Sequence, residues 1–181
     1  MDFNSSFIQY DYWLVKFEYL RWLFDRKFRH VIVDSGIQDI KDGKHYSKTF
    51  LMQYGYKAKY FTEIFDEKIW FVSPDYPCEK QWRGEESIFE RMINTVKIAK
   101  FMKQKFPEVN WLFVLQGGGA LDYLKCSELY KKANIDLARI GLGTVCKAKG
   151  RNRIFYATNI VRKLYPNAYI HAFGLTMRYI E

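Results

Sequence analysis

Five short apolar segments recur along the chain, and each leads directly into glycine or polar residues. With the residues that follow them, they span 31–36, 70–75, 111–118, 138–143 and 169–175. Short, almost continuous apolar runs that end in this way are typical of buried strands in a parallel sheet. We therefore expect five buried strands whose carboxyl ends carry functional groups, the arrangement from which an α/β barrel builds its active site.

Apolar positions with helical spacing separate these segments. The clearest helix is predicted over 85–105, where Ile88, Met92 and Val96 share one stripe, acidic residues come first and lysines come last. The other predicted elements are helices over 121–133 and 153–164, an N-terminal helical segment over 1–29, and a short helix with a loop across the mouth of the site over 43–67. Alternating strands and helices indicate parallel strands joined by right-handed crossovers.

The length of the chain limits the architecture. A complete eight-stranded barrel takes about 250 residues, with about 200 as a lower limit, and this chain has 181. We expect an α/β fold that is an incomplete or minimal TIM-type (β/α) barrel with mostly parallel strands, or else an open doubly wound sheet. No linker or repeat divides the sequence, so residues 1–181 are expected to form a single domain. Because an open sheet leaves unpaired edges, the N-terminal aromatic segment should cover one edge, or two chains should associate.

Composition excludes several classes of protein. The chain is 49% hydrophobic and 19% aromatic, which excludes a disordered protein. No apolar run reaches the roughly 18 residues of a membrane span, and no signal peptide is visible, so we expect a cytoplasmic protein of a prokaryotic or virus-infected cell, without a membrane partner. The three cysteines are widely spaced, which favours free thiols over a zinc site. We expect no metal ion and no cofactor.

Positive charge is concentrated in the second half of the chain. The formal net charge is +9, and residues 91–181 hold 16 basic and 5 acidic residues. Four cations follow the fourth predicted strand, in a segment that resembles a loop opening into a helix: Lys147, Lys149, Arg151 and Arg153. Such a helix start is suited to binding phosphate, although a solvated loop has the same composition. We favour nucleic acid or a nucleotide phosphate as its ligand.

The residues at the strand ends are the candidate site. Asp34 and Asp75 leave neighbouring strands, so their carboxylates could share general acid and base roles or accept hydrogen bonds from a ligand. Gln116 has a donor and an acceptor, which suits it to a polar heterocycle, and glycines allow a flat ligand to approach the backbone. Singly, each is better explained by a cap or a turn; as a set they favour a ligand pocket. The set is Asp34, Ser35, Gly36, Asp75, Gln116, Gly117, Gly118, Gly141 and Gly143, with His171 as a weaker catalytic candidate.

Five motifs occur at these strand ends in a fixed order. They are Asp-Ser-Gly at 34–36, Ser-Pro-Asp-Tyr-Pro-Cys-Glu at 73–79, Leu-Gln-Gly-Gly at 115–118, Ile-Gly-Leu-Gly-Thr-Val-Cys-Lys at 140–147 and His-Ala-Phe-Gly-Leu at 171–175. In this order and spacing the chain resembles the tRNA-guanine transglycosylase superfamily, particularly its short branch related to the DNA deazapurine-inserting protein DpdA. The resemblance implies an α/β barrel that exchanges guanine for a 7-deazaguanine in tRNA or DNA, after the base is turned out of its stack.

The resemblance also implies roles for individual residues. Asp34 matches the general acid/base, Asp75 the aspartate that reads the Watson–Crick edge of guanine, and Gln116 the glutamine of the base pocket. The backbone that frames the base corresponds to Gly117, Gly141 and Gly143. The implied partners are tRNA, DNA or a free purine base.

The chain departs from the family pattern at two places. The family's nucleophile, a second aspartate that attacks C1′ of the ribose, lies on the strand after the one that carries His-Ala-Phe-Gly-Leu, whereas this sequence stops at Glu181. Ile37 and Gln38 replace a small residue and an aromatic. We therefore expect base exchange by the family mechanism to fail.

Three functions remain open after these departures. The protein could bind a guanine-type base and complete its site with a partner chain or in a homodimer. It could be an N-glycosidase of altered mechanism that uses Asp34 or His171. It could also be a repurposed nucleic-acid-binding or structural interaction module that acts through its basic half.

Overall fold

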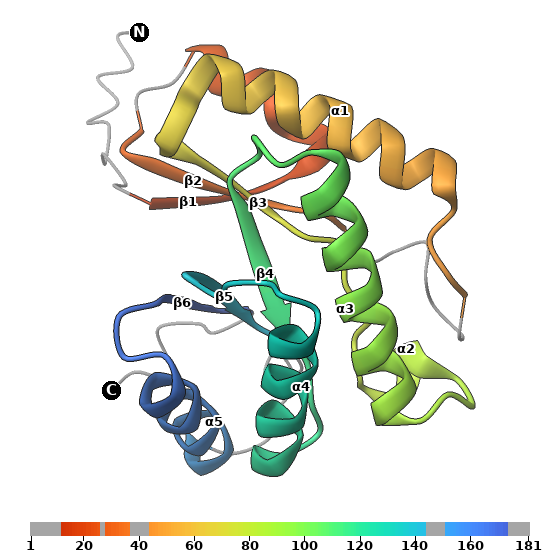
Figure 1. Ribbon diagram of the computed structural model, residues 1–181. Helices are drawn as coiled ribbons and strands as arrows, with labels where there is room; N and C mark the ends of the chain where they lie inside the picture. Colours follow the sequence, from red (N-terminus) through yellow and green to blue (C-terminus); the bar gives the residue numbers. More distant parts are fainter. Residues whose placement is uncertain (1–11, 26–27, 37–43, 144–150, 174–181) are drawn as a thin grey trace, which may run out of the picture.

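In the part of the chain that the structure describes, six parallel strands form one sheet that curls into a half-barrel with helices around it (Figure 1). The computed structural model describes residues 12–25, 28–36, 44–143 and 151–173. The strands, in sheet order, are β1 Tyr12–Lys16, β2 His30–Asp34, β3 Ile69–Val72, β4 Trp111–Leu115, β5 Arg139–Leu142 and β6 Tyr169–Ala172. The helical elements are η1 Phe17–Asp25, α1 Lys48–Phe65, η3 Asp66–Lys68, α2 Lys80–Arg83, α3 Ile88–Lys105, α4 Ala120–Lys132 and α5 Arg151–Leu164. The predicted fold class, an incomplete (β/α) barrel, is confirmed.

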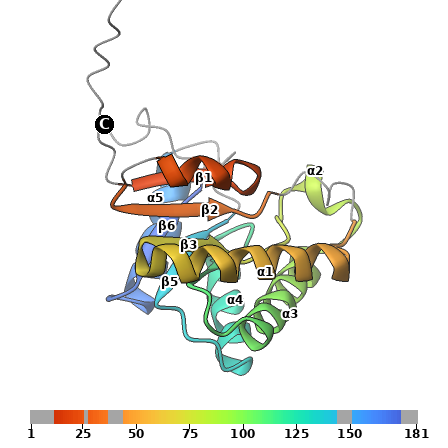
Figure 2. The same cartoon turned by 90° about the horizontal axis from the view of Figure 1, so that it is seen from above.

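Alternation along each strand creates two separate apolar layers. In β2, Val31 and Val33 belong to the large core between the sheet and the helices. Ile32 points the other way and packs with Val72 and Leu112 on the concave side of the sheet. Figure 1 shows α1 along the first three strands and α4 and α5 beside the last three, and Figure 2 shows α1 from above. The parallel strands, in sequential order, place all their carboxyl ends at one edge of the half-barrel.

The helical segment predicted over 1–29 is only partly helical where the structure describes it. Residues 12–16 form β1, which pairs in parallel with β2 in the register Tyr12 with His30 and Lys16 with Asp34. A 3₁₀ helix, η1, follows, and its Leu20 and Leu23 are buried in the outer core. Aromatic and β-branched residues in this segment favour a strand. Pairing with β2 also satisfies backbone N–H and C=O groups at its edge that would otherwise lack hydrogen-bond partners. The segment therefore covers the edge of β2 as a strand and not as a helix.

The segment predicted as a short helix and loop over 43–67 is instead one long helix, α1. Ser47 caps it, its Oγ accepting a hydrogen bond of 3.1 Å from the backbone N–H of Phe50. Gly55 does not break this helix. A Cβ on Gly55 would lie 2.0 Å from Cε2 of Phe106, so the glycine allows an aromatic ring to pack directly on the helix backbone. A close tertiary contact, and not a turn, explains this glycine.

The three remaining predicted helices exist with similar bounds. α3 begins with a capping box, in which Ser87 and Glu90 bond to each other's backbone N–H. Cys78 and Cys126 are buried free thiols, as expected, and Cys146 lies outside the described residues. Within the described ranges, no helix has the length and apolar character needed to cross a membrane.

Candidate functional site

Asp34 is positioned by the end of β2 and by the turn that follows it. Its Oδ1 accepts a hydrogen bond of 3.1 Å from the backbone N–H of Gly36, which has a φ of 72°. This left-handed conformation suits glycine, so Gly36 lets the chain fold back on the carboxylate. Ser35 between them is 4% exposed and lies beneath the surface. The carboxylate itself is half-buried at the rim of the half-barrel.

Asp75 and Gln116 form a buried pair at the ends of β3 and β4. Nε2 of Gln116 donates a short hydrogen bond to Oδ2 of Asp75. The two side chains are only 7% and 1% exposed. Gly143, at the end of β5, makes room for this pair, because a Cβ there would lie 2.3 Å from Nε2 of Gln116. Tyr123 holds Gly143 in place through a hydrogen bond of 2.8 Å from its hydroxyl to the Gly143 carbonyl oxygen.

Asp75 has an unusual acidity. Burial, and then the negative charge of Asp34, raise the pKa of Asp75 from 3.8 to about 7, although the hydrogen bond from Gln116 opposes the rise. Near neutral pH the carboxyl therefore exchanges readily between its charged and neutral forms. A perturbed carboxyl beside a second carboxylate is the pattern of a functional site.

His171 lies on β6, within electrostatic range of Asp34. Burial lowers the pKa of His171 and the charge of Asp34 raises it, so the imidazole is predominantly neutral at pH 7. Its ring centroid lies 4.9 Å from that of Phe173. The structure thus brings together five of the predicted residues, Asp34, Asp75, Gln116, Gly143 and His171.

Two of the predicted glycines have packing roles instead of open backbone. A Cβ on Gly141 would lie 2.6 Å from Cε2 of Phe173 and 2.8 Å from Cδ2 of Leu112, inside the half-barrel. A Cβ on Gly117 would meet Cβ of Asp122 at 2.8 Å, at the turn into α4. Both glycines are needed for close packing around the site.

Sequence reasoning missed two tyrosines that connect the loops of the site. The hydroxyl of Tyr46 donates to the Gly36 carbonyl oxygen over 3.3 Å, and its backbone N–H donates to the hydroxyl of Tyr76 over 3.1 Å. The backbone N–H of Tyr76 donates to Oγ1 of Thr95 over 2.9 Å, which ties the connection to α3. Burial and the charge of Asp75 raise the pKa of Tyr46 well above its usual value. The one available signal was the position of Tyr76 directly after Asp75.

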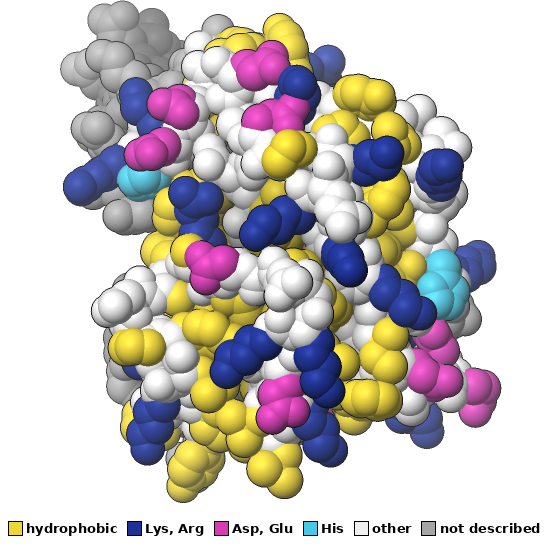
Figure 3. Space-filling view, in the orientation of Figure 1, with side chains coloured by type: hydrophobic (Ala, Val, Ile, Leu, Met, Phe, Trp, Pro, Cys, Tyr) yellow, Lys and Arg dark blue, Asp and Glu magenta, His cyan; other side chains and the backbone are white. Residues whose placement is uncertain are grey.

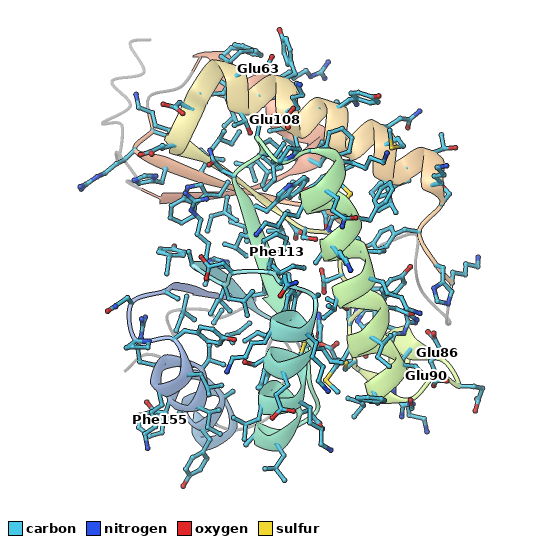
Figure 4. The ribbon with its side chains drawn as sticks, viewed as in Figure 1. Glu63, Glu86, Glu90, Glu108, Phe113 and Phe155 are labelled. Carbon is cyan, nitrogen blue, oxygen red and sulfur yellow. The ribbon has the colours of Figure 1, made fainter. Side chains whose placement is uncertain are left out.

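A fully buried arginine supports Tyr76 from α3. Nε of Arg91 lies 2.8 Å from Oε2 of Glu86, and the guanidinium lies 5.1 Å from the centroid of the Tyr76 ring. Figure 4 labels Glu86 close to the start of α3, beside α2. Loss of this ion pair would leave an unpaired charge buried away from water, which is energetically costly. Arg91 therefore holds its carboxylate and aromatic partners firmly in place.

The predicted phosphate-binding residues are only partly within the described structure. Lys147 and Lys149 lie outside the described residues. Arg151 and Arg153 belong to the first turn of α5, and their side chains are not described. Among the residues with described positions, no group of three His, Cys, Asp or Glu side chains could hold a metal ion.

The fold and the site together define the class of the protein: an α/β half-barrel with a buried carboxylate–amide pair and a second carboxylate at the carboxyl ends of its strands. The family model DpdA, "DeoxyPurine in DNA protein A", matches residues 52–179, and the chain belongs to this tRNA-guanine transglycosylase-like family. The match contains Asp75, Gln116, Gly143 and His171, and it begins after Asp34. A search of curated proteins found no match.

Proposed function

We propose that the protein binds a guanine or 7-deazaguanine base of DNA at the Asp75–Gln116 pair. The observation that carries this proposal is the buried hydrogen bond between these two side chains, with the Asp34 carboxylate near enough to raise the pKa of Asp75. The family name supports a role in deazapurine modification of DNA, and therefore DNA over tRNA as the polymer.

The chemistry of the pair is complementary to the Watson–Crick edge of guanine. That edge offers two neighbouring N–H donors and one carbonyl acceptor, and 7-deazaguanines keep it unchanged. An ionised Asp75 accepts from the two donors, and Gln116 has a further amide N–H that can donate to the carbonyl. Ionising a buried Asp75 costs electrostatic free energy. Two charge-assisted hydrogen bonds from the ligand would offset this cost. Asp34 is then placed to exchange a proton with the base or its leaving nitrogen.

The proposal is tested by isothermal titration of the intact protein with guanine and with 7-cyano-7-deazaguanine at pH 8. We expect both to bind, and we expect Asp75→Asn to lose at least tenfold in affinity because its amide repels one of the two donors. The matched control is Asp136→Asn, which changes an exposed aspartate and should bind as the wild type does. No heat of binding with the wild-type protein, or equal binding by Asp75→Asn, would reject the base site.

A further inference from the structure

A groove of about 680 Å³ opens between the first turns of α3 and α4. Ile88 and Met92 give it an apolar wall, and Phe89 stands beside them with half of its surface exposed. Arg83, from the end of α2, and Lys125, from α4, bring two cations to its lining. Figure 3 shows hydrophobic side chains exposed between the lower parts of α3 and α4, with basic side chains beside them.

The groove adjoins the loop that follows Gln116. A Cβ on Gly118 would lie 2.6 Å from Cδ1 of Ile88, so this loop touches the apolar wall directly. The backbone N–H of Gly118 donates to Oδ2 of Asp122 over 2.9 Å, and Asp122 is the one carboxylate among the described residues that line the groove. The groove and the Asp75–Gln116 pair thus lie on either side of one short loop.

We propose that this groove holds a nucleotide of single-stranded DNA that flanks the bound base. The choice of DNA as the polymer rests on the proposed function. The choice of a nucleotide as the occupant of the groove rests on the chemistry of the groove itself. An exposed phenylalanine ring offers a surface on which any base can stack. Arg83 and Lys125 match the phosphate of the same nucleotide. An apolar helix of a protein partner would use the wall and leave both cations without a counter-charge.

Such a contact would help to deliver the base. A base must leave its stack to reach a buried pocket, and the protein has to hold the strand beside it while this happens. Leu121, 70% exposed at the start of α4, adds an apolar surface next to the same loop. The groove is therefore the site of sequence-tolerant strand binding, and the Asp75–Gln116 pair is the site of base choice.

The test is fluorescence anisotropy of a short labelled single-stranded DNA with the intact protein. Phe89→Ala should weaken binding by at least about fivefold because the stacking surface is lost, and Phe89→Tyr should keep wild-type affinity. Lys125→Ala should reduce the slope of log affinity against log salt by about 0.7. The matched controls are Phe155→Ala, another largely exposed ring, on α5 (Figure 4), and Lys131→Ala at the far end of α4.

The outcomes separate this inference from the base site. Free guanine should bind Phe89→Ala as it binds the wild type, whereas Asp75→Asn should lose the free base. If no free base binds at all, the base site fails, and the anisotropy of the DNA still reports on the groove. An unchanged DNA affinity in Phe89→Ala, or an equal loss in Phe155→Ala, would overturn the groove proposal and leave the apolar wall to a protein or small-molecule partner.

Discussion

Replacing Asp75 with asparagine should change how the stability of the protein depends on pH. The folded protein raises the pKa of Asp75 from 3.8 to about 7. Well below pH 3.8 the carboxyl is protonated in both the folded and unfolded states, so it makes no contribution that depends on pH. Between these two values the unfolded chain loses the proton and the folded chain keeps it, and the free energy of unfolding falls as pH rises.

The size of the effect follows from the shift. A difference of about three pKa units corresponds to about 4 kcal/mol, reached in full above pH 7, since one unit is 1.36 kcal/mol. Asparagine keeps the shape of the side chain and can still accept the hydrogen bond from Gln116, but it does not ionise. Asp75→Asn should therefore gain stability relative to the wild type between pH 5 and 8, by up to about 1.4 kcal/mol per pH unit.

The assay is urea unfolding of wild type and Asp75→Asn at several pH values from 5 to 8. His171 makes the same contribution to the pH dependence of stability in both proteins. The difference between their two curves of unfolding free energy against pH therefore isolates the contribution of Asp75. Asp34→Asn should reduce the slope of the wild type, because the charge that helps to raise the pKa of Asp75 is gone. Asp136→Asn serves as the control and should follow the wild type. Parallel curves for wild type and Asp75→Asn would refute the buried, proton-exchanging carboxyl.

Two further results are expected. Gly143→Ala should displace Gln116, since its Cβ would lie 2.3 Å from Nε2 of that side chain. It should lower the affinity for guanine, and it should lower the free energy of unfolding in urea by about 1–3 kcal/mol. Gly119→Ala is the control, because a Cβ there meets nothing within 4 Å. Tyr76→Phe removes the acceptor for the backbone N–H of Tyr46, so it should lower the free energy of unfolding by about 1 kcal/mol and guanine affinity a few-fold in titration. Tyr156→Phe, at an exposed tyrosine, should change neither quantity.

The pattern of the sequence predicted the strands and their carboxyl ends well. Each strand is a short buried run, so its position depends mainly on local composition, and the polar residue that ends it necessarily lies at the common edge of a parallel sheet. Asp75 and Gln116 are 41 positions apart, yet their places at the ends of β3 and β4 brought them together as expected. Their direct hydrogen bond depends on Gly143 and could only come from the structure.

Contacts between distant segments account for the errors. The helix α1 is longer than the short helix predicted over 43–67, because the sequence does not show that the ring of Phe106 packs on the helix backbone at Gly55. The N-terminal segment has helical spacing of its apolar residues, but the free edge of β2 draws residues 12–16 into the sheet. The hydrogen bond between Tyr46 and Tyr76 could not be predicted for the same reason, because the two tyrosines belong to different loops.

The most direct test of the base site is a crystal structure of the protein soaked with 7-cyano-7-deazaguanine. The base should lie at the carboxyl ends of β3 and β4, with its two N–H donors on the Asp75 carboxylate and its carbonyl oxygen on the amide of Gln116. Asp34 should lie at its other edge. Density for the base elsewhere, or an Asp75–Gln116 pair that stays closed while the base binds outside it, would contradict the proposed site.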